Sequence, residues 1–330
     1  MMRLSGLGRK SLETGPPAES VPRRRRDRRR FRIGWRWAAT CLFFTTALAF
    51  SQEGVRFAVI GDYGSGGKPG ADSGDVANEK RVADLVKGWN PQFIITLGDN
   101  NYNSGDAETM EANVGRFYGS FISRTEEQNR FFPCLGNHDW RGGKDWHGKP
   151  EDVPLIKPYL DYFTLPGNER YYEFVRGPVH FFAIDSDPHE PDGTDVGSVQ
   201  AQWLKERLAA ATEPWKVVFF HEPPYTGGPR HHASANMRWP FKLWGASVVL
   251  TGHEHNYQHL RIEGLDFIVN GLGGGGRYTG TVEEVAGMIK HYSASYGAIR
   301  AEADNNKLVL RFITTSGELI ESVILQKPPG

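Results

Sequence analysis

The sequence predicts an α/β fold, in which short buried strands alternate with helices. Five short apolar runs are rich in Val, Ile and Phe, and each one ends within a residue or two of a polar cluster. Runs of this kind are typical of strands buried on both faces. Helical patterns lie between some of them, which favours βαβ units. Hydrophobic residues make up 39% of the 330 residues, so the composition excludes a disordered chain or a coiled coil.

The first 49 residues predict an export signal. Residues 1–36 contain twelve Arg or Lys and three Asp or Glu, and an apolar stretch follows at 37–50 with Ala47-Leu48-Ala49 near its end. A basic region, a short apolar core and a small-x-small site make up a secretory signal. The apolar run is shorter than the ~20 residues of a membrane span. A nuclear-localisation or nucleic-acid patch and an uncleaved anchor are the alternatives.

We therefore divide the chain into a signal at 1–49 and a catalytic domain at 50–330, with cleavage near Ala49. Arg28-Arg29-Arg30-Phe31 resembles a twin-arginine signal, so both this route and the general export route stay open. The mature protein would be secreted, periplasmic or in an endomembrane lumen, without stable membrane insertion. Beyond residue 36 the chain carries 27 basic and 36 acidic side chains, which argues against a nucleic-acid partner. The sequence leaves the oligomeric state open.

Each of the five predicted strands is followed by polar residues. The pairs of strand and cluster are 56–60 with Gly61-Asp62, 93–97 with Gly98-Asp99, 131–135 with Gly136-Asn137-His138, 217–220 with His221, and 248–251 with Gly252-His253-Glu254-His255. In open α/β sheets the carboxyl ends of the strands line the ligand crevice. We therefore expect the five clusters to meet at one site.

Two helices and a C-terminal hairpin complete the predicted elements. The pattern at 76–88 places Val82, Leu85 and Val86 on one face, and the pattern at 198–211 does the same for Val199, Trp203, Leu204 and Leu208. Near the C-terminus, apolar residues alternate at 308–312, Ser316-Gly317 can turn the chain, and 319–325 returns. This pattern predicts an antiparallel hairpin beside a sheet, within one domain spanning about 54–327.

The polar clusters contain the side chains of a metal site. Asp, Asn, His and Tyr form a mixed oxygen and nitrogen set without sulfur, which suits iron, zinc or manganese. Seven ligands exceed what one ion takes from a protein, and a carboxylate can bridge two ions about 3.5–4 Å apart. Each cluster alone is also typical of a turn or a helix cap. The candidate ligands are Asp62, Asp99, Tyr102, Asn137, His221, His253 and His255.

The same residues carry a resemblance to a known family. The clusters at 62–64, 98–102, 136–139, 218–221 and 252–255 resemble, in order, the five sequence blocks of the purple acid phosphatases, which belong to the calcineurin-like metallophosphoesterases. The length fits the short single-domain type. The resemblance implies a four-layer α/β/β/α sandwich built from two βαβαβ halves.

The resemblance also implies a role for each ligand. Fe(III) would be held by Asp62, Tyr102 and His255. A second, divalent ion (Fe, Zn or Mn) would be held by Asn137, His221 and His253. Asp99 would bridge the two ions.

Three further histidines receive roles by the same resemblance. His138 would face the leaving group as an acid or orienting donor, without binding metal. His231 and His232 resemble paired histidines that line the substrate pocket in some larger members, although a solvent-exposed loop is the alternative for this pair. The segment 140–154 is a candidate rim or lid.

Tyr102 favours ferric iron in the site. A free phenol has a pKa of about 10, so only a strong Lewis acid can hold it as phenolate in acid. Its alternative role is a core tyrosine that closes a turn. Three anionic ligands and a bridging hydroxide would leave a ferric–divalent pair with about one positive charge, which attracts phosphate inside an acidic protein.

We therefore expect an acid phosphatase that hydrolyses small phosphomonoesters by attack of metal-bound hydroxide at a binuclear Fe(III)–M(II) centre. His138 would protonate the leaving group. A phosphodiesterase or nucleotide hydrolase on the same fold is the first alternative. A non-catalytic secreted metalloprotein and a redox centre are the others.

Overall fold

The computed structural model describes residues 54–65, 73–141 and 155–327. The predicted export signal and most of the candidate lid lie outside these residues. The strands are β1 Val55–Ile60, β2 Phe93–Thr96, β3 Phe131–Pro133, β4 Tyr172–Arg176, β5 Val179–Ala183, β6 Trp215–Phe219, β7 Val248–Thr251, β8 Tyr257–Ile262, β9 Leu265–Asn270, β10 Met288–Tyr292, β11 Gly297–Ala303, β12 Lys307–Thr314 and β13 Leu319–Gln326. The helices are α1 Ser73–Gly88, α2 Ala107–Met110, α3 Arg116–Tyr118, α4 Lys157–Tyr162, α5 Val199–Ala210 and α6 Phe241–Trp244; a π-helical turn, Glu111–Gly115, joins α2 to α3.

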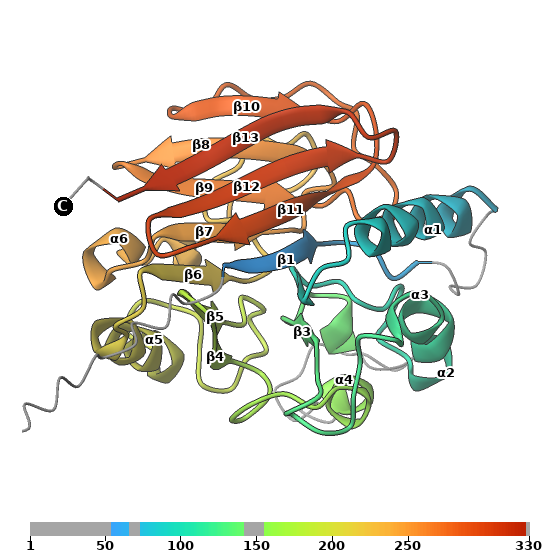
Figure 1. Cartoon of the computed structure of the whole chain (residues 1–330), viewed down its shortest axis with the longest axis horizontal. Helices are drawn as coiled ribbons and strands as arrows, with labels where there is room; N and C mark the ends of the chain where they lie inside the picture. The colour runs from blue at the N-terminus through green and yellow to red at the C-terminus, as the bar shows by residue number, and fades with distance from the viewer. Residues whose placement is uncertain (1–53, 66–72, 142–154, 328–330) are drawn as a thin grey trace, which may run out of the picture. The chain divides into compact units, whose positions relative to one another are not determined.

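Two mixed sheets form the centre of the described fold (Figure 1). One sheet has the order β13-β12-β11-β1-β2-β3, and the other has the order β10-β8-β9-β7-β6-β5-β4. Strands β1, β2 and β3 are parallel, as are β5, β6 and β7. Helix α1 follows β1, and α5 and α6 follow β5 and β6. These connections give two βαβαβ halves, which confirms the predicted α/β sandwich.

Aromatic side chains fill the space between the sheets. The ring centroids of Phe57 on β1 and Phe181 on β5 lie 5.0 Å apart, edge to face. Those of Tyr257 on β8 and Phe312 on β12 lie 4.4 Å apart. Large rings bury much apolar area and prefer such offset or edge contacts. The central strands β2, β6 and β7 are buried along nearly their whole length, which explains their unbroken apolar sequences.

Most predicted elements are present, with one local error. All five apolar runs form strands, and β12 and β13 form the predicted antiparallel hairpin. In α5, however, Val199 is 64% exposed and does not belong to the buried face. Ser198 caps this helix by accepting a hydrogen bond from the Ala201 amide, so Val199 lies in the first turn. The buried face consists of Gln200, Ala201, Leu204 and Leu208.

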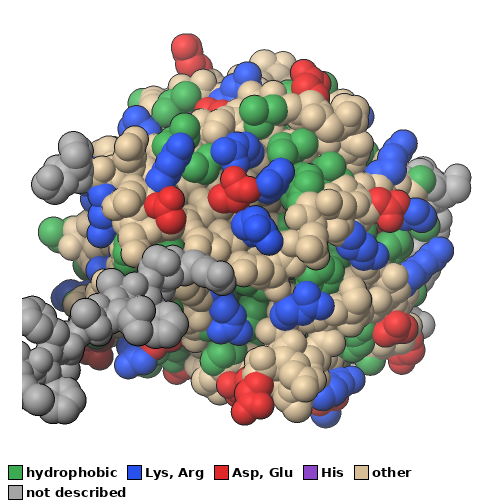
Figure 2. Space-filling model, in the orientation of Figure 1, with side chains coloured by type: hydrophobic (Ala, Val, Ile, Leu, Met, Phe, Trp, Pro, Cys, Tyr) green, Lys and Arg blue, Asp and Glu red, His purple; other side chains and the backbone are tan. Residues whose placement is uncertain are grey.

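The surface of the described fold is mixed in charge. Figure 2 shows basic and acidic side chains interspersed over the face drawn there, between apolar and neutral ones. This face therefore does not present the continuous basic stripe that is typical of nucleic-acid binding. Among the described residues, every helix is too short or too polar to cross a membrane.

A polar network joins the two sheets at one edge. His259 on β8 contacts Asp266 on β9 (Nε2 to Oδ1, 3.0 Å) and Glu321 on β13 (Nδ1 to Oε1, 2.9 Å). The Tyr257 hydroxyl also donates to Glu321. Burial alone would lower the pKa of His259, but the two carboxylates outweigh it and raise this pKa to about 9. The imidazolium therefore bridges carboxylates that belong to different sheets.

We expect His259→Gln to reduce the free energy of unfolding by about 1–3 kcal/mol at pH 6, because it removes a buried charged hydrogen-bond donor. The folded-state pKa is raised, so this contribution is complete below pH 6.5 and is lost as the pH rises towards 9. Urea unfolding of both proteins at several pH values measures the difference. Lys205→Gln, on the exposed side of α5, is the control. A difference that does not shrink towards pH 9 would contradict the charged network.

Candidate metal centre

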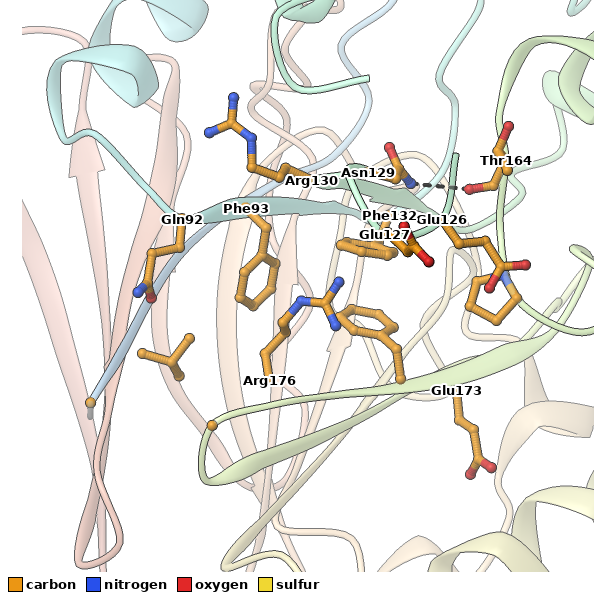
Figure 3. Close-up of a pocket in the computed structure, with 15 residues that line it drawn as sticks. Gln92, Phe93, Glu126, Glu127, Asn129, Arg130, Phe132, Thr164, Glu173 and Arg176 are labelled. Atoms are coloured by element: carbon orange, nitrogen blue, oxygen red, sulfur yellow. Dashed lines mark hydrogen bonds between the residues drawn. The ribbon is translucent and has the colours of Figure 1, made fainter. Parts of the chain in front are cut away.

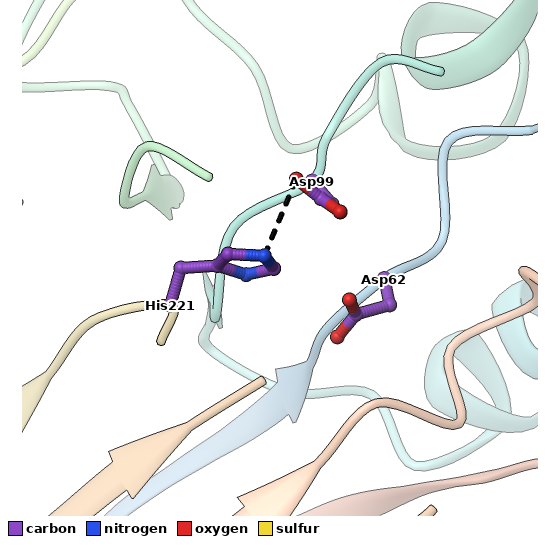
Figure 4. Close-up of side chains that lie close together, drawn as sticks. All are labelled: Asp62, Asp99 and His221. Atoms are coloured by element: carbon purple, nitrogen blue, oxygen red, sulfur yellow. Dashed lines mark ion pairs between the residues drawn. The ribbon is translucent and has the colours of Figure 1, made fainter. Parts of the chain in front are cut away.

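The predicted ligands follow five strands and turn into one cleft. Asp62 follows β1, Asp99 follows β2, and His253 follows β7. All three have left-handed backbone conformations, with φ of 57°, 52° and 68°. Such conformations cost a non-glycine residue free energy and are typical of functional sites. Figure 4 shows the carboxylates of Asp62 and Asp99 beside the His221 ring, which comes from the end of β6.

Glycines beside the ligands allow the dense packing of this cleft. A Cβ atom on Gly98 would lie 2.7 Å from Nδ1 of His221, and one on Gly136 would lie 2.4 Å from Oδ1 of Asp99. Both distances are shorter than real Cβ contacts. Gly98 also has a φ of +85°, which side chains other than glycine rarely adopt. Gly98 and Gly136 therefore each make room for a ligand from another sequence block.

The first group of donors surrounds the Tyr102 hydroxyl. Its Oη lies 3.4 Å from Oδ1 of Asp62 and 3.0 Å from Nε2 of His255. Nε2 of His255 lies 3.2 Å from the same Asp62 oxygen. These are the three side chains predicted to hold the ferric ion.

The second group surrounds His221. Its Nε2 lies 3.1 Å from Oδ1 of Asn137 and 3.0 Å from Nδ1 of His253. Asp99 connects the two groups, because its Oδ2 is 2.8 Å from the Tyr102 hydroxyl and its Oδ1 is 3.4 Å from Nε2 of His221. The structure thus brings all seven predicted ligands together, in the two sets that the resemblance implied.

Backbone carbonyls orient two of the histidines. Nδ1 of His221 is 2.8 Å from the carbonyl oxygen of Leu97. Nδ1 of His255 contacts the carbonyl oxygen of Gly276, in the glycine-rich segment after β9. In the neutral ring, a nitrogen that donates to a carbonyl fixes the tautomer, so the other nitrogen, Nε2, would present a lone pair to a metal ion in the cleft.

The buried charges of the cleft fit cations. Asp62 and Asp99 are 0% and 2% exposed, and within the described residues only histidines form ion pairs with them. Burial would raise the pKa of Asp99, but His221 and His138 outweigh it and lower it well below its usual value. For His221, burial would lower the pKa, but the charge of Asp99 outweighs burial and raises this pKa to about 10. Atoms of Asp62, Asp99 and His221 lie within 4.8 Å of one another, so the donor set and its spacing fit bound metal ions.

Tyr102 needs a cation to ionise here. Burial, followed by the charges of Asp99 and Asp62, raises the pKa of its phenol well above the ordinary value. A phenolate in this position therefore requires a strong neighbouring Lewis acid.

His138 lies beside the donors. Its amide donates to Oδ1 of Asp99 (3.0 Å), and its Nδ1 is 2.5 Å from the carbonyl oxygen of Asn103. Its ring centroid is 4.3 Å from that of Tyr102. Nε2 lies 3.9 Å from Oδ2 of Asp99, the nearest carboxylate oxygen. The ring therefore presents Nε2 to the cleft, in a position to exchange a proton with a bound molecule.

His231 and His232 occupy different surroundings. A cavity of about 240 Å³, which we call the metal cavity, is lined by Asp99, Asn137, His138, Arg230, His231, His253, His255 and Tyr278. The ring centroid of His231 is 4.0 Å from that of His253. Burial and nearby His255 lower the pKa of His231 to about 4, so the ring is neutral above that pH. His232 is exposed and lines only a neighbouring cavity, which His231 also lines.

Three residues near the cleft escape the sequence prediction. The Arg230 guanidinium lies 4.7 Å from the centre of the Tyr278 ring, which stacks on His255 at 4.2 Å. Glu254, buried between the two predicted histidine ligands, accepts hydrogen bonds from the amides of Arg230 and His231. Glu254 could have been predicted from the sequence, because it belongs to the block Gly252-His253-Glu254-His255. Arg230 directly precedes the candidate residue His231, which is a signal that could have drawn attention to it. Tyr278 belongs to none of the five sequence blocks.

A larger cavity than the metal cavity lies elsewhere. Its volume is about 850 Å³, and Figure 3 shows its lining, which includes Phe93, Phe132 and Arg176. Gly54 and Val55, at the start of β1, also belong to it, whereas the candidate ligands follow the strand ends. Size alone would therefore mislead, since the buried charges lie at the smaller cavity.

Comparison with known proteins agrees with this geometry. The family model described as "Calcineurin-like phosphoesterase" matches residues 55–257. Human tartrate-resistant acid phosphatase type 5 is 28% identical over 274 residues, which cover 72% of this chain and 79% of that protein. Purple acid phosphatase 3 of Arabidopsis thaliana is 22% identical and covers 66% of this chain and 63% of its own length.

Solved structures share the fold at low sequence identity. The purple acid phosphatase PPD1 of yellow lupin has a TM-score of 0.65 at 17% identity, with 83% of this chain and 54% of that chain covered. GAP50, described as the anchor in the inner membrane complex of Plasmodium, has a TM-score of 0.62 at 20% identity. The match covers 84% of this chain and 90% of that chain. The family model covers well over half of this chain. The chain therefore belongs to the calcineurin-like phosphoesterase family of metal-dependent hydrolases.

Proposed function

We propose that the protein is an acid phosphatase that hydrolyses small phosphomonoesters at a binuclear Fe(III)–M(II) centre. The observation that carries this proposal is the division of seven donors into two groups joined by Asp99. One group contains the Tyr102 hydroxyl, a ligand type that suits ferric iron. The similarity to purple acid phosphatases supports the same reaction.

In this proposal, Asp62, Tyr102 and His255 hold the ferric ion, and Asn137, His221 and His253 hold the divalent ion. When bound, the two ions supply Lewis acidity that activates water and neutralises charge on the phosphoryl oxygens. The chain's own side chains fix the remaining geometry. The Leu97 carbonyl orients His221, so that its Nε2 points into the cleft before any substrate arrives.

His138 acts as the general acid in this scheme. Its Nδ1 contacts the Asn103 carbonyl, which leaves Nε2 free to give a proton to the departing alkoxide or phenoxide oxygen. Its amide is bonded to Asp99, so the ring is held at a fixed position beside the donors. His231 lines the same cavity as a neutral hydrogen-bonding group.

We also propose that the protein is exported. The support is the basic and apolar sequence at 1–49, which lies outside the described residues.

The first test compares a phosphomonoester with a phosphodiester. The protein loaded with iron and zinc should hydrolyse para-nitrophenyl phosphate in acid, at least tenfold faster than bis-(para-nitrophenyl) phosphate. A chelator should abolish both rates, and Asp99→Asn should lose metal and activity together, because Asp99 contacts both donor groups. Faster diester hydrolysis would favour the phosphodiesterase alternative. Absence of both reactions in a protein with two bound metals would favour a non-catalytic metalloprotein.

Tyr102→Phe should remove the visible absorption of the iron-loaded protein while the fold remains. The reason is that a phenolate bound to Fe(III) gives a charge-transfer band, and phenylalanine cannot bind. Visible spectra with metal analysis of both proteins measure this. A band that survives the substitution would exclude Tyr102 as an iron ligand. Wild-type protein with two metals and no band would indicate a centre with divalent ions only.

His138→Ala should keep its metal content and lose about 10²–10⁴-fold in turnover for esters with poor leaving groups. Esters of acidic phenols, whose leaving groups need no proton, should lose much less. Steady-state rates over a series of phenyl and alkyl phosphates give this dependence. His189→Ala is the control, because His189 does not line the metal cavity. Equal losses along the whole series would argue against the acid role.

A further inference from the structure

A second cavity adjoins the metal cavity. Its volume is about 320 Å³, and we call it the arginine cavity. Arg230 and His231 line both cavities, so they form the wall between them. The other polar residues of the arginine cavity are Tyr225, Thr226, His232, Arg238, Thr281 and Glu283.

Two arginines carry the charge of this cavity. Arg230 and Arg238 both line it, and neither forms an ion pair with a carboxylate among the described residues. Glu283 is the one carboxylate in its lining. The cavity is therefore cationic, although the chain beyond residue 36 carries more acidic than basic side chains.

Aromatic rings hold both guanidinium groups in place. Arg230 lies over Tyr278 at 4.7 Å, and Arg238 lies over Tyr225 at 4.9 Å. Nε of Arg238 also donates to the Pro224 carbonyl (2.9 Å), which leaves its terminal nitrogens as donors. Cation–π contact fixes an arginine without neutralising it, so each keeps its positive charge for a ligand.

The loop that carries these residues is anchored on the metal centre. Buried Glu254 lies between the predicted ligands His253 and His255 in the sequence. Its carboxylate accepts hydrogen bonds from the backbone amides of Arg230 (3.2 Å) and His231 (2.9 Å). Tyr278 is tied to the same region, since its amide donates to the His255 carbonyl. The distance from the donors to Arg230 is thus set by short covalent and hydrogen-bonded connections.

We propose that the arginine cavity binds the leaving-group part of the substrate and selects small leaving groups that carry a second phosphate. This inference rests on the proposed phosphatase function. The phosphoryl group that reacts occupies the metal cavity beside His138. The remainder of the substrate extends past Arg230, and its second phosphate accepts hydrogen bonds from Arg230 and Arg238. Guanidinium groups suit phosphate because their planar donors match its oxygens.

Two substrates that differ only in the second phosphate test this proposal. They are propane-1,3-diol bisphosphate and 3-hydroxypropyl phosphate. We expect kcat/KM for the first phosphate removed to be about 10- to 100-fold higher for the bisphosphate, as hydrogen bonds to charged groups imply. Two equivalent phosphates account for a factor of two of this. A ratio of two or less would overturn the proposal.

Two variants should change this ratio in opposite directions. Arg238→Gln should raise KM for the bisphosphate about tenfold, leave kcat unchanged and leave the monophosphate within about twofold. Glu283→Gln should increase the preference for the bisphosphate, because it removes the negative charge from the lining. Arg116→Gln is the matched control, since Arg116 is an exposed arginine over the Phe117 ring and does not line the cavity. Equal losses for both substrates in Arg238→Gln would indicate a structural role and overturn the proposal.

Calorimetric binding of both esters separates this inference from the proposed function. If the protein hydrolyses neither ester, the phosphatase proposal fails. Binding of the bisphosphate that weakens about tenfold in Arg238→Gln still supports the arginine cavity. Binding that does not change overturns it. The same measurement is made with a peptide in which an aspartate follows a phosphoserine. If Arg238→Gln weakens binding of this peptide more than binding of the bisphosphate, the proposal of a small-ligand site is overturned.

Discussion

The structure depends on the burial of two carboxylates, Asp62 and Asp99, which among the described residues form ion pairs with histidines only. Asp62 and Asp99 are almost inaccessible to water, and buried charges cost several kcal/mol each unless they are compensated. Histidines from distant parts of the chain supply part of that compensation. Bound cations would supply the rest. The strand ends must therefore stay where they are, because displacing any one of them leaves a buried carboxylate without a partner.

The two-sheet architecture meets this constraint by distributing the donors over both halves. Asp62, Asp99 and Asn137 follow parallel strands of one sheet, and His221 and His253 follow parallel strands of the other. The aromatic layer between the sheets sets their separation, and the His259 network ties one edge of the sandwich. Neither sheet contains a complete site alone. Packing between the sheets is thus a condition for the metal centre.

The sequence predicted what is local, and missed what depends on contacts between distant segments. An apolar run followed by a polar cluster is visible in a few residues, so five strands and all seven candidate ligands could be named. Strand β8 could not, because its polar residues are buried by partners on other strands, as His259 is by Glu321. For the same reason the sequence did not predict Arg230 and Tyr278. Contacts with Glu254 and His255, from a distant segment, place these two residues beside the site. His232 was paired with His231 by adjacency. Both line the arginine cavity, but only His231 also lines the metal cavity.

The two arginines would explain how an acidic chain can favour a ligand with two phosphates. Solvent-exposed charges separated by more than about 8 Å are largely screened at physiological ionic strength, so distant surface carboxylates contribute little to the potential in a cavity. The groups that line the cavity decide instead. At the donor cleft these are histidines and the cations that the carboxylates require. At the adjoining wall they are Arg230 and Arg238, which aromatic rings hold without neutralising. In our proposals, the carboxylates would bind metal and the arginines beyond it would bind a second phosphate, so a substrate with two phosphates would use both.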